Sequence, residues 1–211
     1  MGLIFLSIVA FFIGRRRNRK TTQAIYEAVW DVLEERCPSD LARFKGSWTG
    51  VVTGAFELRR GEVFETMEVI VSMIQRELGF HYLLSRRIKK IDRLTVWATM
   101  RRRPRFEMVA VSWNHHNLGS LIERLKAVDL GDGGSGELRL YASDVESARR
   151  FFRERVAPRV AEMGSALKEL AVDKEKASVH LLLEARPEHV IPSLKLAFDL
   201  GAFASRRGRR G

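Results

Sequence analysis

The chain has 211 residues, of which 45% are hydrophobic, and this is enough for one domain with its own core. Lysine and arginine total 37 against 26 acidic residues, and the formal net charge of +11 favours polyanionic partners, either nucleic acid or anionic lipid. A single cysteine, Cys37, excludes an internal disulfide and any CxxC metal or redox motif, which indicates a reducing compartment.

The N-terminal segment, residues 3–13, is an uncharged apolar run that stops at Gly14, before a basic hexapeptide, residues 15–20. This order is the reverse of a secretory signal peptide, in which the positive charge comes first. We therefore predict a short N-terminal membrane helix within a membrane anchor over residues 1–20, with the N-terminus outside and the domain in the cytoplasm. The run covers less than about 20 Å of a hydrocarbon core about 30 Å thick, so a re-entrant or surface-lying helix and a buried core helix are alternatives to a full span.

Residues 21–205 are predicted to form a single cytoplasmic α+β domain, and residues 206–211 a basic tail. The domain is expected to begin with an amphipathic helix over residues 21–36, which Pro38 ends. Its apolar face consists of Ile25, Ala28, Val29, Val32 and Leu33.

Four extended runs follow this helix in the sequence. Residues 48–59 and 63–75 are separated by a turn-like Arg-Gly-Glu and predict a hairpin. Residues 94–101 and 106–113 predict two further strands. The basic turn that joins them, residues 102–105, is expected at the surface because so much charge is not buried.

The second half of the domain alternates helices with strands. Leu118, Leu121, Ile122 and Leu125 mark an amphipathic helix, and residues 138–142 a short strand. Ser143 and Glu146 form a capping box for a long helix that is predicted to continue to Leu170, with a kink at Pro158.

The chain is predicted to end with a strand over residues 179–185 and a helix over residues 188–205 that has Pro192 in its first turn. Together these elements predict an α+β fold with a mixed or mostly antiparallel sheet covered by helices.

No catalytic, cofactor or metal site is predicted. The glycine-rich segment 131–136 matches no phosphate-binding pattern, and Ser135 within it lacks the strand-to-helix context of a nucleophile. We therefore expect a protein that is not an enzyme and has no cofactor and no small-molecule substrate. The five histidines also stand at no metal-ligand spacing; they are His81, His115, His116, His180 and His189.

Basic residues gather in four clusters, which are candidates for contacts with a polyanion or a partner. One interpretation is that the first cluster only sets the topology and the others are solvated surface. The other is that several clusters face one polyanion, either anionic headgroups or RNA phosphates, without sequence-specific reading of RNA. The clusters are Arg15, Arg16, Arg17, Arg19 and Lys20; Arg86, Arg87, Lys89 and Lys90; Arg101, Arg102, Arg103 and Arg105; and Arg206, Arg207, Arg209 and Arg210.

The order of these features resembles the calumin family, endoplasmic reticulum membrane proteins of the coiled-coil-domain-containing class that pair with Asterix in the PAT complex. The resemblance covers nearly the whole chain and consists of order, hydrophobic pattern and scattered identities. It rests on an apolar segment ending FFIGRRRNRK, on AIYEAVWDVLEERC and GVVTGAFELRR, on LTVWATMRRRPRFEMVAVSWNHHNLGSLIERLKAVDL, and on ASVHLLLEA and HVIPSLKLAFDL.

The resemblance implies a non-enzymatic membrane-protein biogenesis factor: a translocon- and ribosome-associated intramembrane chaperone subunit or scaffold. The implied partners are the membrane, a small multipass membrane protein like Asterix, the Sec translocon and the ribosome with its RNA. The luminal segment and the C-terminal coiled coil of the family are missing, so we expect a short prokaryotic, archaeal-like relative in the plasma membrane. The alternative is a membrane-tethered domain that binds RNA or anionic lipid through its basic clusters.

Overall fold

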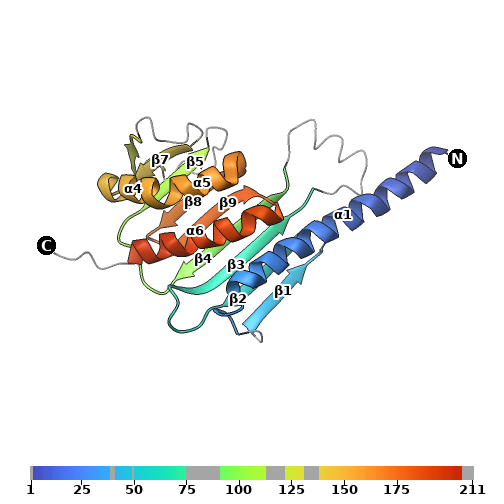
Figure 1. Ribbon diagram of the computed structural model, residues 1–211, viewed down its shortest axis with the longest axis horizontal. Helices are drawn as coiled ribbons and strands as arrows, with labels where there is room; N and C mark the ends of the chain where they lie inside the picture. Colours follow the sequence, from blue (N-terminus) through green and yellow to red (C-terminus); the bar gives the residue numbers. More distant parts are fainter. Residues whose placement is uncertain are drawn as a thin grey trace.

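The computed structural model describes residues 2–38, 41–48, 50–74, 91–112, 122–130 and 138–205. Within these residues, strands form one large sheet and the long helices lie on one of its faces (Figure 1). In chain order the elements are α1 Gly2–Leu33, β1 Ala42–Gly46, β2 Val51–Glu57, β3 Phe64–Ser72, β4 Arg93–Met100, β5 Met108–Ser112, β6 Lys126–Val128, β7 Leu138–Ala142, α4 Val145–Phe151, the π-helix η3 Phe152–Val156, α5 Ala157–Met163, the 3₁₀ turn η4 Gly164–Ala166, β8 Leu167–Asp173, β9 Ser178–Glu184 and α6 Pro187–Ser205.

The strand order in the sheet is β1-β2-β3-β4-β9-β8-β5-β7-β6, and each neighbouring pair is antiparallel. The α+β prediction with a mostly antiparallel sheet is therefore confirmed, and so is the hairpin of β2 and β3. The two strands on either side of the basic turn, β4 and β5, are not neighbours, because the hairpin of β8 and β9 lies between them. β1 and β6, which form the edges of the sheet, were not predicted.

The alternation of side chains explains which face the helices cover. Val52 and Phe56 of β2 are buried toward the helices, as are the apolar residues at the paired positions of β3 and β4. On the opposite face, Val109, Val111 and Ala171 form a second, smaller cluster against Ile122 and Leu125.

Helix α1 joins two segments that the sequence suggested were separate, the apolar run and the amphipathic helix. Its buried stripe includes Ile25, Val29 and Leu33, as predicted, and it packs beside α6 over the sheet (Figure 1). The helix ends at Leu33, before the predicted end, in a turn closed by the bond from the Cys37 amide to the Leu33 carbonyl (2.7 Å). In the described part of the chain no helix is both long and apolar enough to cross a membrane, so the structure gives no support for the predicted membrane helix.

The predicted long helix after β7 is wrong at both of its ends. Asp144, not Ser143, caps the start: its Oδ1 accepts from the Ser147 amide at 3.1 Å, whereas the Ser143 hydroxyl accepts from the Glu107 amide at 2.8 Å. At the other end, Gly164 takes a positive φ of 58° and stops the helix. Leu167 and Leu170 therefore belong to β8, a strand with buried residues on both faces.

Two prolines act close to their predicted positions. Pro158 lies in the first turn of α5, directly after the π-helical turn η3, which accommodates the missing amide where a kink was expected. Helix α6 begins at Pro187, so Pro192 lies in its second turn instead of its first. The glycine segment 131–136 and the predicted helix up to Leu121 lie outside the described residues.

Candidate functional site

The outward face of α1 carries the first basic cluster next to exposed apolar side chains. Val9, Phe12 and Ile13 are 38%, 63% and 64% exposed. All five basic residues from Arg15 to Lys20 are also exposed. Figure 1 shows this part of the helix running past the strands, away from the body of the domain. The apolar zone therefore lies on a projecting rod, and the basic zone runs along this rod to the point where it joins the domain.

A buried asparagine fixes the point at which this rod joins the domain. Asn18 lies within the basic hexapeptide, is fully buried, and donates from Nδ2 to the carbonyl of Ile74 at 2.8 Å. The Ile74 amide in turn donates to Oδ1 of Asp92 at 2.7 Å. The orientation of the exposed arginines is thus set by a hydrogen-bonded anchor on the sheet.

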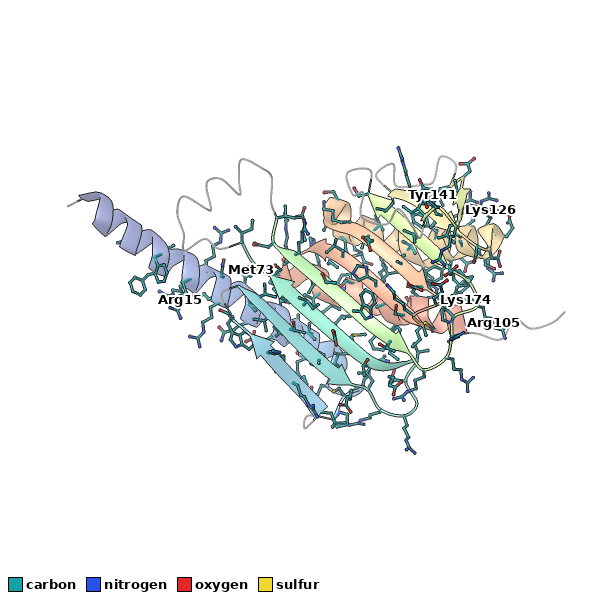
Figure 2. The ribbon with its side chains drawn as sticks, turned by 180° about the vertical axis from the view of Figure 1, so that it is seen from behind. Arg15, Met73, Arg105, Lys126, Tyr141 and Lys174 are labelled. Atoms are coloured by element: carbon teal, nitrogen blue, oxygen red, sulfur yellow. The ribbon has the colours of Figure 1, made fainter. Side chains whose placement is uncertain are left out.

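The cluster at residues 101–105 lies at the other end of the molecule; Figure 2 shows Arg15 and Arg105 far apart. Arg102, Arg103 and Arg105 are exposed, as predicted. Arg101 has a structural role, because its Nη2 donates to the carbonyl of Leu58 at 2.7 Å. These two clusters therefore do not form one surface.

The other two predicted clusters, at residues 86–90 and 206–210, lie outside the described residues. The described residues hold no group of three potential metal-ligating side chains. Among the histidines, His180 is in contact with Glu169, with 2.7 Å between Nδ1 and Oε1, and its ring packs on Trp97. His189 is buried in α6, while His81, His115 and His116 fall outside the described residues.

A groove that was not predicted lies between α1 and the edge strand β1, with a volume of about 550 Å³. Its aromatic floor is held by Tyr26, whose ring packs edge-on against Phe44 and Trp48 at centroid distances of 5.2 and 5.5 Å. Glu27 and Asp31 form its acidic rim one helical turn apart. The sequence gives one weak signal for this groove, the spacing of these two carboxylates on one helix face.

The Tyr26 hydroxyl anchors the floor of the groove. It lies 3.0 and 2.7 Å from the carbonyls of Val52 and Val69, so its single proton is shared between β2 and β3. Burial raises the pKa of Tyr26, which keeps the hydroxyl protonated as a donor. The close approach depends on Gly54, since a Cβ there would lie 2.6 Å from the Tyr26 ring.

Comparison with known proteins identifies no family for this chain. No family model and no curated protein matches it. A crystal structure of the mycobacterial trehalose monomycolate transport factor A resembles the fold with a TM-score of 0.43 and 10% identity, over 74% of this chain and 71% of that chain. A likeness this remote carries no argument about function.

Proposed function

We propose that this chain is a non-enzymatic membrane-associated accessory protein that attaches to anionic membranes through the N-terminal end of α1 and holds its domain on the cytoplasmic side. The observation that carries the proposal is the order of exposed zones on α1, apolar at Phe12 and Ile13 and basic from Arg15 to Lys20. This order suits a lipid surface, where apolar side chains enter the acyl boundary and arginines reach the headgroups.

Both zones are needed for stable attachment. Full burial of a Phe or Ile side chain is worth about 1.5–3 kcal/mol, so residues that are 63% and 64% exposed supply about 1–2 kcal/mol each. Each Lys or Arg near an anionic surface adds about 1 kcal/mol. The apolar zone alone would bind marginally and reversibly, whereas the two zones together resemble the paired signals of stable membrane anchors.

Vesicle flotation of the full chain tests this proposal. We expect binding to vesicles of phosphatidylserine and phosphatidylcholine, weaker binding to phosphatidylcholine alone, and loss of the anionic preference at high salt. Phe12→Ser with Ile13→Ser should weaken binding at every salt concentration. Arg16→Gln with Lys20→Gln should act mainly at low salt. The matched control is Arg102→Gln with Arg103→Gln, which removes two exposed arginines from the opposite end.

Equal flotation of all three variants and the wild type would refute the proposal. Binding to bare RNA with no binding to vesicles would favour the alternative, a domain that contacts nucleic acid through the same arginines.

The resemblance to the calumin family extends this proposal to a specific role. In this form the chain is a scaffold or intramembrane chaperone subunit beside the translocon, and it assists the insertion of multipass membrane proteins. Purification of the tagged chain in mild detergent should then recover Sec components and a small multipass membrane protein like Asterix. Recovery of lipid alone, without these proteins, would remove the biogenesis role and leave the membrane attachment.

A further inference from the structure

We propose that the groove between α1 and β1 binds an extended basic segment of a partner membrane protein, specifically the Lys- or Arg-rich flank that follows a membrane span on the cytoplasmic side. The inference rests on the proposed membrane attachment for its biological setting. The binding chemistry follows from the groove itself.

The shape of the groove fits an extended chain. Gln23, Glu27 and Asp31 lie at four-residue intervals along α1, so this wall is about 12 Å long. An extended peptide rises about 3.3 Å per residue, and about four residues therefore span the wall. The opposite wall is β1, an edge strand that pairs only with β2 within the described residues, so the groove is open on the outer side of this strand.

The surfaces of the groove favour a peptide in which apolar and basic side chains alternate. Phe44 and Trp48 are 47% and 37% exposed, unusually open for aromatic residues, and with Tyr26 they offer a floor for aliphatic side chains. Glu27 and Asp31 are exposed on the rim and have no ion pair among the described residues. Every second residue of an extended peptide would contact the floor, and a lysine or arginine between them would reach a carboxylate or stack on an aromatic face.

The charges along α1 also determine where the basic residues of the peptide bind in the groove. Lys20 lies just before Gln23 at one end of the groove, and Asp31 lies at the other. A basic residue is therefore favoured near Glu27 and Asp31 and disfavoured near Lys20. Because the chain carries a net charge of +11, a basic peptide would be repelled from most of its surface, and the acidic rim of the groove is an exception to this repulsion.

The position of the groove next to the basic zone indicates which class of partner it binds. It begins three residues after the basic zone that we propose contacts the headgroups, and thus lies close to the cytoplasmic membrane surface. Short cytoplasmic flanks of membrane spans are enriched in lysine and arginine. A basic segment next to an apolar one is therefore the sequence that this surface meets most often.

The test measures binding of a fluorescent nine-residue peptide of alternating leucine and lysine to the full chain in solution, by anisotropy. Glu27→Gln with Asp31→Asn should weaken binding about 3- to 30-fold and flatten its salt dependence, as expected for two partly exposed charge contacts. Phe44→Thr should weaken binding without changing the salt dependence. The control, Glu34→Gln with Glu35→Gln, removes two exposed carboxylates just beyond the end of α1 and should bind like the wild type. Near-UV circular dichroism verifies that each variant is folded.

Two further ligands separate the outcomes. A peptide of alternating leucine and glutamate is attracted by the net charge of +11, but it should bind the groove variants and the wild type equally. Spermidine should not compete at concentrations that saturate the lysine peptide, and competition by spermidine would make the groove a site for small organic cations and overturn the proposal. Absence of peptide binding, or equal binding by the groove variants and the wild type, would also overturn it.

The same variants in vesicle flotation distinguish this inference from the proposed function. Because Glu27 and Asp31 lie outside the apolar and basic zones, and their neutralisation only removes repulsion from anionic lipid, their variant should float at least as well as the wild type. If the wild type floats with vesicles but does not bind the peptide, only the groove proposal is refuted. If the wild type binds the peptide but does not float, the proposed membrane attachment is refuted, and so is the assignment of the peptide to a membrane protein.

Discussion

Replacing Gly54 with alanine should disturb the floor of the groove and the packing of α1 on the sheet, and should therefore destabilise the protein. The new Cβ would lie 2.6 Å from Cε1 of Tyr26, 3.0 Å from Cε2 of Phe56 and 3.1 Å from Cε1 of Phe44. Three aromatic rings would therefore have to move at once. The Tyr26 ring has little freedom to do so, since its hydroxyl is bonded to two strands.

The expected loss in the free energy of unfolding follows from these contacts. Overpacking a core position costs about 1–3 kcal/mol. Stretching the Tyr26 hydrogen bonds adds about 1 kcal/mol. Replacing glycine by alanine within a strand returns up to about 1 kcal/mol through backbone entropy. The net destabilisation should be about 1–4 kcal/mol.

Urea denaturation followed by far-UV circular dichroism measures this loss. Gly50→Ala and Gly61→Ala are matched controls, because a Cβ at either position meets nothing within 4 Å, and they should stay within about 0.5 kcal/mol of the wild type. In a Tyr26→Leu background the Gly54→Ala change should cost less, which a double-mutant cycle would reveal. If Gly54→Ala unfolds at the same urea concentration as the two controls, Gly54 is not required to admit the Tyr26 ring.

Three other substitutions test single contacts. Asp144→Ala should cost about 1 kcal/mol at pH 7 as a lost helix cap. Hydrogen bonds from Ser147 lower the pKa of Asp144 in the folded protein. The contribution of the Asp144 carboxylate to stability is therefore complete above about pH 4 and is lost as the pH falls through the folded-state pKa. Urea denaturation at pH 7 and at pH 3 should show that the stability difference between Asp144→Ala and the wild type is smaller at pH 3. Arg101→Gln should cost about 1–2 kcal/mol in urea denaturation, whereas Arg102→Gln should change stability by less than about 0.5 kcal/mol. Asn18→Ala should cost about 1–2 kcal/mol and speed hydrogen exchange where α1 meets the sheet, and unchanged exchange there would refute its anchoring role.

Much of the fold could be predicted because most strands alternate. β2, β3 and β4 have one buried and one partly solvated face, and their apolar residues recur at every second position. The stripe of Ile25, Val29 and Leu33 gave the packed half of α1 in the same way. The basic residues of the two described clusters are exposed, as their charge predicted, and Arg101 is in addition bonded to the β2–β3 turn.

The errors have physical reasons. β8 is buried on both faces, so its leucines lose the two-residue period, and Leu167 and Leu170 fit the helical spacing that precedes them. Only the backbone turn at Gly164 separates the two. β1 has a single large apolar residue, Phe44, and β6 has three residues in all, too few for any periodicity. The groove depends on the contact between Tyr26 and Gly54, which no local pattern reveals.

The place of the β8–β9 hairpin in the sheet has a consequence for how the chain folds. In the described sheet, β1 to β4 form a four-stranded meander, and β5, β7 and β6 form a smaller three-stranded group. The two groups are joined in the sheet by the hairpin of β8 and β9, which is made near the end of the chain. Until residues 167–184 arrive, β4 and β5 are open edges rich in valine, leucine and methionine, the kind of edge that pairs with other chains. Closing them requires contacts distant in sequence, which slows folding. During synthesis the nascent chain therefore exposes two unpaired strand edges at the same time. A truncation before residue 167 should yield aggregates instead of a smaller folded protein.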